Sequence, residues 1–212
     1  MRSLQTAAAV PILLLLSVGS VRAQGTGWLA LGGGVTYTTP ADPDSATSHT
    51  GYGIAWRIGH GQPGFGWEFG FNWFSTDLLQ PVGRLRTDLG QLHVRPFMPG
   101  YGYSYRIGPA MVTADVIGGY SLNSFRLTPA AVGAYRAQPG AGTVKADVSN
   151  AWVVKPELNL WLDLSRTLGL NVNYGYMVVR PTLAITSTSG VDERSIKADV
   201  YMLKAALVYR VF

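Results

Sequence analysis

The chain has 212 residues, enough for one domain with a substantial core, and it contains 26 glycines, 11% aromatic residues and only 14% charged residues. Because cysteine is absent, neither a disulfide framework nor a thiolate metal site is possible. The net charge is +5, or +3 without Arg2 and Arg22 (15 basic residues against 12 acidic ones), which is too small to indicate a nucleic-acid partner.

The first 23 residues have the features of a secretory signal peptide. Arg2 supplies the positive end, residues 7–16 form a short apolar stretch, and Val21, Arg22 and Ala23 form an acceptable cleavage site. The apolar stretch is too short to span a membrane as a helix. We therefore expect cleavage after Ala23, which leaves one domain over residues 24–212 that begins at Gln24.

Eight segments of the mature chain alternate between apolar and small or polar residues with the period of two that is typical of β-strands. They cover residues 27–38, 49–58, 65–73, 88–107, 110–123, 148–164, 168–179 and 196–212. The third segment shows the pattern most strongly, because Phe65, Trp67, Phe69, Phe71 and Trp73 share one side. Glycine, Glu68 and Asn72 occupy its other side.

The fourth segment changes parity along its length. Leu92, Val94, Pro96 and Met98 form its first apolar side, with Gln91, His93 and Arg95 opposite, whereas Tyr101, Tyr103 and Tyr105 form the second. A slip of one residue at Pro99 and Gly100 would be produced by a β-bulge.

The connections between the segments alternate in length. Polar connections at 39–48, 75–87, 124–147 and 180–195 are long, whereas those at 59–64, 108–109 and 165–167 are short turns. Long loops at one end and short turns at the other are typical of outer-membrane barrels. The sequence therefore predicts an all-β fold: an eight-stranded antiparallel up-and-down transmembrane β-barrel, with both termini in the periplasm.

A soluble eight-stranded barrel with its apolar face inward is the alternative. Three features favour the membrane-spanning barrel over the soluble one. The polar side is rich in glycine, alanine and serine, which suits a narrow lumen. That side also carries charges of both signs, and aromatic residues such as Tyr37, Trp56, Trp152 and Tyr201 lie near strand ends, as interfacial girdles do.

The charged residues of the polar side are predicted to form a paired network inside the barrel, since an unpaired buried charge costs several kcal/mol. The network would comprise Arg57, Glu68, Arg95, Arg106, Asp115, Lys155, Glu157, Asp163, Lys204 and Arg210. A plug that stabilises the barrel is favoured over a narrow ion path, because eight strands leave just enough room for side chains.

These features together resemble the small outer-membrane β-barrel domains of the OmpA, OmpX and OmpW type, over the whole span from Trp28 to Phe212. The resemblance rests on the strand pattern, the loop asymmetry and the C-terminal aromatic strand. It implies that Tyr209 and Phe212 form the signal for the barrel-insertion machinery, although simple alternation places Phe212 on the side of Arg210. It also implies outer-membrane lipid as a partner and the bacterial outer membrane as the location.

Catalytic and cofactor patterns are weak. Gly59, Gly61 and Gly64 match a dinucleotide-binding spacing, but Pro63 interrupts it and no helix follows, so we interpret it as a turn. A hydrolytic site would need His93, or His49 with Asp192, Glu193 or Ser45, within hydrogen-bond reach. We expect no enzyme, no cofactor and no metal site.

Three functions remain open. The first is a structural or surface-interaction role, in which the extracellular loops present a binding surface for an extracellular ligand. The second is a narrow pore or a conduit for small or apolar molecules, with a lateral opening near the irregularity at residues 96–100. The third is an outer-membrane lipid-modifying enzyme or protease. We rank them in that order.

Overall fold

The computed structural model describes residues 29–42, 46–58, 63–82, 85–137, 142–188 and 190–210, with the backbone alone at 57–58, 80–82 and 85–87. The predicted signal peptide, residues 59–62 of the first short turn, Ser45 and Phe212 lie outside this description. Among the described residues, no helix is long and apolar enough to cross a membrane.

Almost every element is a strand. The elements are β1 (Leu29–Pro40), β2 (His49–Ile58), β3 (Gly64–Gly70), β4 (Phe74–Val82), β5 (Leu85–Ile107), β6 (Ala110–Leu127), α2 (Pro129–Arg136), β7 (Lys145–Val148), β8 (Ala151–Asp163), β9 (Leu168–Val179), β10 (Thr182–Ser187), β11 (Gly190–Ser195) and β12 (Val200–Arg210). Two predicted strands, 49–58 and 168–179, have the same bounds as β2 and β9.

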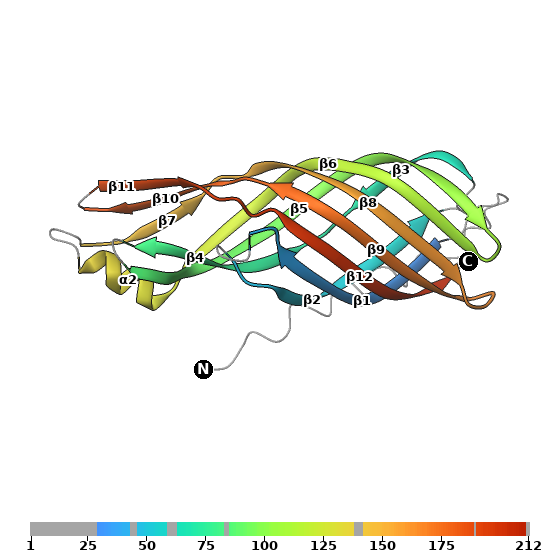
Figure 1. Ribbon diagram of the computed structural model, residues 1–212, viewed down its shortest axis with the longest axis horizontal. Helices are drawn as coiled ribbons and strands as arrows, with labels where there is room; N and C mark the ends of the chain where they lie inside the picture. The colour runs from blue at the N-terminus through green and yellow to red at the C-terminus, as the bar shows by residue number, and fades with distance from the viewer. Residues whose placement is uncertain are drawn as a thin grey trace, which may run out of the picture.

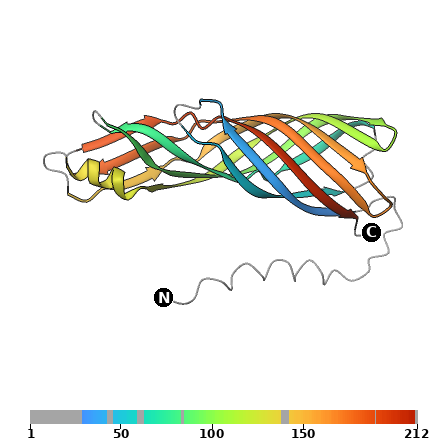
Figure 2. The ribbon, with the colours of Figure 1, turned by 60° about the horizontal axis from the view of Figure 1, so that its bottom comes forward.

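One antiparallel sheet forms the body of the molecule. Its strand order is β2-β1-β12-β9-β8-β6-β5-β3, and β4 also pairs with β5. The sheet curls around a common axis, so that the strands enclose an interior (Figures 1 and 2). The second sheet, with the order β11-β10-β7, lies together with α2 at one end of the molecule (Figure 1). Among the described residues no ladder joins β2 to β3, so hydrogen bonds do not close the wall there.

The predicted two-sided pattern is confirmed along most strands. Trp67 is 71% exposed and Leu158 is 56% exposed on the outer side, whereas Lys155 is fully buried on the inner side. The two described short turns, at 108–109 and 165–167, lie at the same end of the sheet, as predicted. The turn between β5 and β6 contains Gly108 at φ +57°, a left-handed conformation that glycine adopts without steric cost.

The predicted slip in the fourth segment is wrong. Phe97 pairs with Tyr120 and Gly100 pairs with Ile117, which is the same offset, so no residue is inserted between them. Leu92, Val94 and Met98 face the interior and are fully buried, whereas Phe97 on the other side is 51% exposed. The error arose because this part of the interior is apolar, so apolar residues alone do not mark the outer face.

The three long connections after the third, fifth and seventh predicted strands are not loops. Residues 74–82 form β4, which extends the β3 edge and pairs with the first half of β5. Residues 129–136 form α2, where the Thr128 hydroxyl accepts a hydrogen bond from the Ala131 N–H (3.1 Å) and caps the helix. Residues 182–195 form the β10–β11 hairpin, which pairs with β7. The barrel therefore continues well beyond its predicted rim.

Two layers of apolar residues fill the interior. The larger cluster lies in the half nearer α2, and its fully buried members include Leu78, Leu92, Val94, Met98, Ile117, Met177 and Val179. The smaller cluster comprises Ala30, Ala55, Met111, Trp161, Ala206 and Val208. The sequence pattern predicts a lumen that is polar throughout, whereas the interior contains these two apolar clusters. The same strands also carry buried polar and charged side chains.

Candidate functional site

The unpaired gap between β2 and the edge formed by β3 and β4 is the most unusual feature of the wall, and we call it the seam. Every other neighbouring pair in the main sheet is joined by a backbone ladder. Only one isolated bridge, between Ala46 and Leu78, connects the two sides of the seam among the described residues. The seam is therefore the place where the barrel wall depends on side chains.

A hydrogen-bonded clamp holds the seam at the end nearer α2. The Thr47 N–H donates to the Asp77 carbonyl (3.2 Å), and the Thr76 hydroxyl donates to the Thr47 carbonyl (3.1 Å). The His49 Nε2 atom lies 3.2 Å from Asp77 Oδ2, and the Gln91 side-chain amide donates to Asp77 Oδ1 (3.1 Å). Asp77 therefore joins β2, β4 and β5 at one point.

Aromatic side chains close the other end of the seam from outside. The Trp56 ring on β2 lies 6.3 Å from the Phe69 ring and 6.2 Å from the Phe71 ring, centroid to centroid. These are distances at which tilted aromatic pairs attract each other. The aromatic contacts replace a ladder in this part of the seam.

Between the clamp and the aromatic contacts lies a cavity of about 220 Å³. Thr36 and Thr38 line it from the buried side of β1, and Phe74 lines it from the inner side of β4. Thr50, Ser75 and Arg95 line it from the opposite, outer side of the wall. The cavity therefore lies within the wall, with lining residues from both the inner and the outer side.

His93 and Arg95, predicted to point inward, face outward in the structure. They alternate with the buried Val94 and lie on the same side of β5 as the exposed Phe97. Arg95 therefore does not belong to the predicted lumen network. Both residues line the outer part of the seam cavity. The mistake follows from the wrong parity assigned to this part of β5.

The structure brings five of the predicted charged residues together inside the barrel. Lys155, which is fully buried, forms an ion pair with Glu157 and donates to the Asn173 side-chain oxygen (2.9 Å). Asp115 pairs directly with Glu157 across β6 and β8. Glu68 and Lys204 line a small cavity with Glu157.

This lumen cluster, which we define as Glu68, Asp115, Lys155, Glu157 and Lys204, holds three acidic groups and two basic ones. Asp115 is 5% exposed, and neither of its carboxylate oxygens has a hydrogen-bond partner among the described residues. Lys204 Nζ lies 3.5 Å from the Ile54 carbonyl on the seam strand β2. Lys155 is the positive charge in direct contact with Glu157.

The remaining predicted members lie elsewhere. Arg210 forms an ion pair with Asp163 and donates to the Arg166 carbonyl (3.3 Å) beside the β8–β9 turn. Arg106 shares the inward side of β5, but its side chain is exposed where the strand ends. The side chain of Arg57 lies outside the described residues. Tyr209 faces outward and is 56% exposed.

Among the described residues, the hydrolytic arrangement considered for His49 does not include Asp192, and Ser45 lies outside this description. The partner of His49 is Asp77, whereas Asp192 accepts a hydrogen bond from the Tyr135 hydroxyl (2.7 Å) and another from Arg194 Nε (2.9 Å). The hydrogen bonds from Arg194 lower the pKa of Asp192, and burial raises the pKa of Tyr135 to about 12. These contacts attach α2 to β11 at the end of the molecule. The described residues contain no group of three or more His, Asp or Glu side chains that could hold a metal ion.

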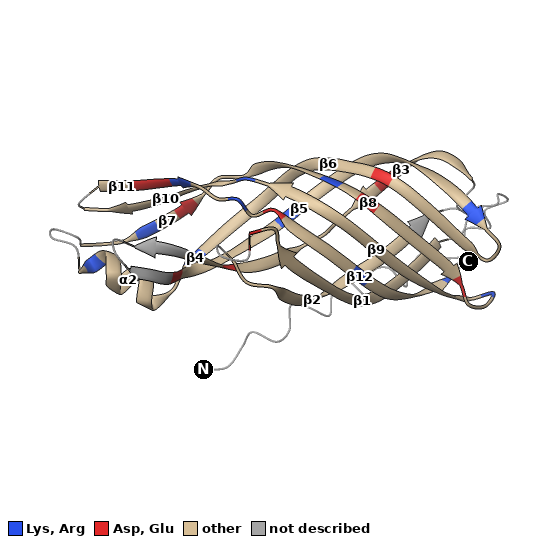
Figure 3. Cartoon of the chain, in the orientation of Figure 1, with Lys and Arg blue, Asp and Glu red and all other residues tan. Residues whose placement is uncertain are grey.

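Sequence reasoning missed the roles of Asp77 and Gln91, because Asp77 lies in a predicted loop and Gln91 lies on a side of the fourth segment that was predicted to face the lumen. No spacing in the sequence marks Asp77 as the partner of His49, which lies 28 residues away. Figure 3 shows charged residues at the α2 end, along the body of the barrel and at the end opposite α2.

No family model matches the sequence, and no characterised protein matches it by sequence comparison. Solved structures do match the fold. The crystal structure of the outer membrane protein OprG from Pseudomonas aeruginosa is 16% identical, with a TM-score of 0.71, and the match covers 87% of this chain and 96% of that one. The solid-state NMR structure of outer membrane protein AlkL in lipid bilayers is 13% identical, with a TM-score of 0.54, covering 88% and 90%.

Proposed function

We propose that this chain, whose fold is that of the small outer-membrane β-barrel proteins, lies in the bacterial outer membrane and passes small apolar molecules through the seam between β2 and β4. The observation that carries this proposal is the cavity of about 220 Å³ at a point where the wall has no ladder. A molecule in that cavity contacts both the interior and the outer surface. The seam therefore provides a route sideways into the membrane.

An axial route is disfavoured by the packing inside the barrel. Trp161 is 9% exposed and packs with Met111 and Val208 in the smaller apolar cluster. The buried Lys155 and Glu157 form an ion pair in the charged layer. Side chains of an eight-stranded barrel commonly fill its interior, as these buried groups do here.

The chemistry of the seam favours apolar cargo. Its inner side adjoins the larger apolar cluster, against which Phe74 packs. Its outer side includes Trp73, which is 63% exposed and lines the cavity. Hydroxyl groups of Thr36, Thr38, Thr50 and Ser75 also line the cavity, so a small uncharged molecule with one polar group can form hydrogen bonds there. A charged solute would lose more hydration free energy on entering than such hydroxyl groups return.

The proposal includes an orientation. Short turns gather at the end where β12 ends, so we place that end and both termini in the periplasm. Tyr209 and Phe212 would then act at the periplasmic end as the signal for the barrel-insertion machinery. The hairpin of β10 and β11 and the helix α2 would project outside the cell. Their ordered, charged surface supports a second candidate function, the binding of an extracellular ligand.

Replacing Gly51 with tryptophan tests the conduit. Gly51 lines the seam cavity, and no atom lies within 4 Å of the position that a Cβ would take. The indole therefore has room to enter the cavity and block it. In cells that carry the protein, we expect G51W to reduce uptake of the apolar fluorophore N-phenyl-1-naphthylamine to the rate of cells that lack it.

Gly33 provides the matched control. A Cβ at Gly33 also meets no atom within 4 Å, but this residue lies on the exposed side of β1, away from the cavity. G33W adds the same bulk to the outer wall and is expected to leave uptake unchanged. Equal uptake by G51W and the unmodified protein, with equal amounts folded in the membrane, would exclude the seam as the route.

A further inference from the structure

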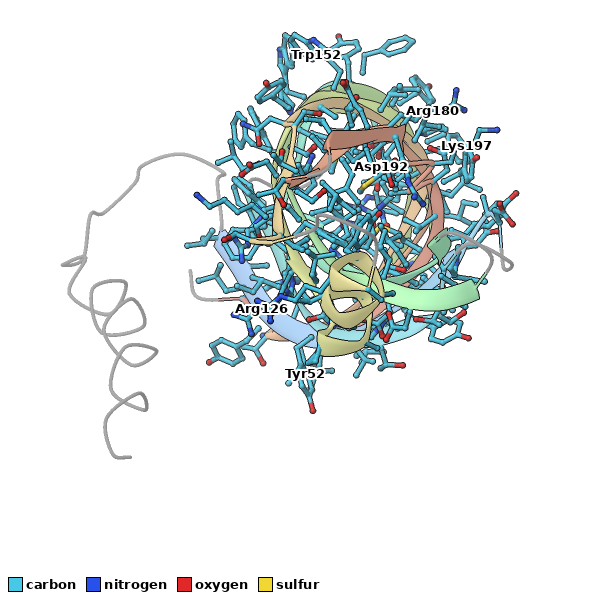
Figure 4. All side chains as sticks on the ribbon, turned by 90° about the vertical axis from the view of Figure 1, so that its left-hand side faces the viewer. Tyr52, Arg126, Trp152, Arg180, Asp192 and Lys197 are labelled. Atoms are coloured by element: carbon cyan, nitrogen blue, oxygen red, sulfur yellow. The ribbon has the colours of Figure 1, made fainter. Side chains whose placement is uncertain are left out.

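Two basic side chains face each other on the outer surface where β9 passes into β10 and β12 begins. The Ala198 N–H donates to the Val179 carbonyl (3.1 Å), and the Ile196 N–H donates to the Pro181 carbonyl (2.8 Å). Arg180 and Lys197 lie between these two bonds and are therefore directly opposite each other. Figure 4 shows both side chains projecting away from the barrel.

Asp199 is the acidic group that contacts this pair of cations, through Arg180. Asp199 accepts hydrogen bonds from the Val179 N–H (3.0 Å) and from Arg180 Nη2 (3.1 Å), and its side chain is only 8% exposed. The Arg180 side chain remains 58% exposed, so other guanidinium N–H groups face outward. Like charges directly opposite each other on a sheet destabilise it. An anion between Arg180 and Lys197 would remove that repulsion.

The position of the pair relative to the aromatic surface indicates where such an anion comes from. On the same outer side, with Val178 and Asp199 between them and the two cations, the rings of Tyr176 and Tyr201 lie 4.8 Å apart. Tyr201 pairs with Tyr176 in the ladder, and the apolar Leu203 follows it with Tyr174 opposite. Tyrosines with their rings toward lipid mark the level of the headgroups in membrane proteins. The cations therefore lie at or just beyond the headgroup level.

We propose that Arg180 and Lys197 form a binding site for the phosphate group of an outer-leaflet glycolipid, with Tyr176 and Tyr201 against the part of the lipid nearest its acyl chains. Arginine offers planar paired donors that suit phosphate oxygens, and lysine adds a second point charge. This site lies on a different part of the wall from the seam. It requires the membrane location but not the conduit.

The test uses the full chain folded in phosphatidylcholine nanodiscs. Lipid A and its dephosphorylated form are added separately, and the bound glycolipid is counted by native mass spectrometry. We expect preferential retention of the phosphorylated lipid, and a loss of about tenfold in R180A/K197A, since hydrogen bonds to charged groups contribute that much or more. The charge-preserving variant R180K/K197R is expected to retain binding and shows whether loss of folding explains the alanine result.

The matched control removes two other exposed basic residues, Arg126 on β6 and Lys145 on β7, neither of which faces a second cation in a ladder. R126A/K145A is expected to bind lipid A as well as the unmodified protein. Three results would overturn the proposal: equal retention of phosphorylated and dephosphorylated lipid, an equal loss in both double variants, or displacement of lipid A by equimolar inorganic phosphate. The last result would assign the site to a free anion.

Discussion

Lys155→Met is expected to destabilise the barrel by about 3–5 kcal/mol, the usual cost of removing one partner of a buried ion pair. Lys155 is fully buried, pairs with Glu157 and donates to Asn173. Its loss leaves Glu157 and Asp115, whose carboxylate has no hydrogen-bond partner among the described residues, with Lys204 as the remaining cation of the lumen cluster. Methionine has a similar length and fills the space, so the lost stability would come from electrostatics and not from packing. Urea unfolding of the protein in lipid vesicles measures this change in the free energy of unfolding.

The double variant K155M/E157Q separates charge from packing. It removes one positive and one negative charge, and the glutamine amide can donate a hydrogen bond toward Asp115. Replacing both partners of a buried pair is often nearly neutral, so the double variant is expected to recover much of the stability lost in K155M. If K155M unfolds at the same urea concentration as the unmodified protein, the lumen cluster does not stabilise the barrel.

Gly34→Ala is expected to prevent correct folding or to cost about 3 kcal/mol or more, at the upper end of the range for overpacking. A Cβ at Gly34 would lie 2.0 Å from the Ala205 carbonyl oxygen and 2.4 Å from the Ala206 Cα. Both are backbone atoms of β12, which cannot move without breaking its ladder with β1. That ladder joins the first described strand to the last. Heat-modifiable migration on a gel reports the folded fraction.

The neighbouring Gly33 shows whether the close approach of β1 and β12 causes the folding defect of Gly34→Ala. Gly33 lies on the same strand, and a Cβ there meets no atom within 4 Å. Gly33→Ala is therefore expected to fold as well as the unmodified chain, since alanine also restricts the unfolded state. Equal folding of G34A and G33A would mean that β1 and β12 are further apart than described here.

Much of the fold could be predicted from alternation alone. Phe65 to Trp73 indicated an outward aromatic face, and β2 and β9 have the predicted bounds. The period of two is reliable wherever one side is apolar and the other is small or charged, as in β8. It failed in the first half of β5, where Leu92 and Val94 are inside. There the interior is apolar, so polarity does not distinguish the two faces.

The charged layer was partly predictable, because inward charges of both signs must compensate one another in a narrow lumen. The prediction located Lys155, Glu157 and Asp115 correctly on the inner side, and it placed Arg95 wrongly for the same reason that it misassigned Leu92 and Val94. The seam could not be predicted. Its opening depends on which strand edges lack a partner, and the pairing of His49 with Asp77 depends on the three-dimensional register. A period of two along each strand carries neither kind of information.

The most direct test of the seam joins its two sides by a reversible covalent link. Thr50 and Ser75 line the cavity from β2 and β4, and the chain contains no cysteine, so T50C/S75C reacts only at these positions. Linking the two thiols with a short bis-thiosulfonate is expected to stop uptake of N-phenyl-1-naphthylamine, and reduction of the link is expected to restore it. The same reagent is expected to leave uptake through the single variant T50C unchanged. Unchanged uptake through the fully linked protein would contradict the account.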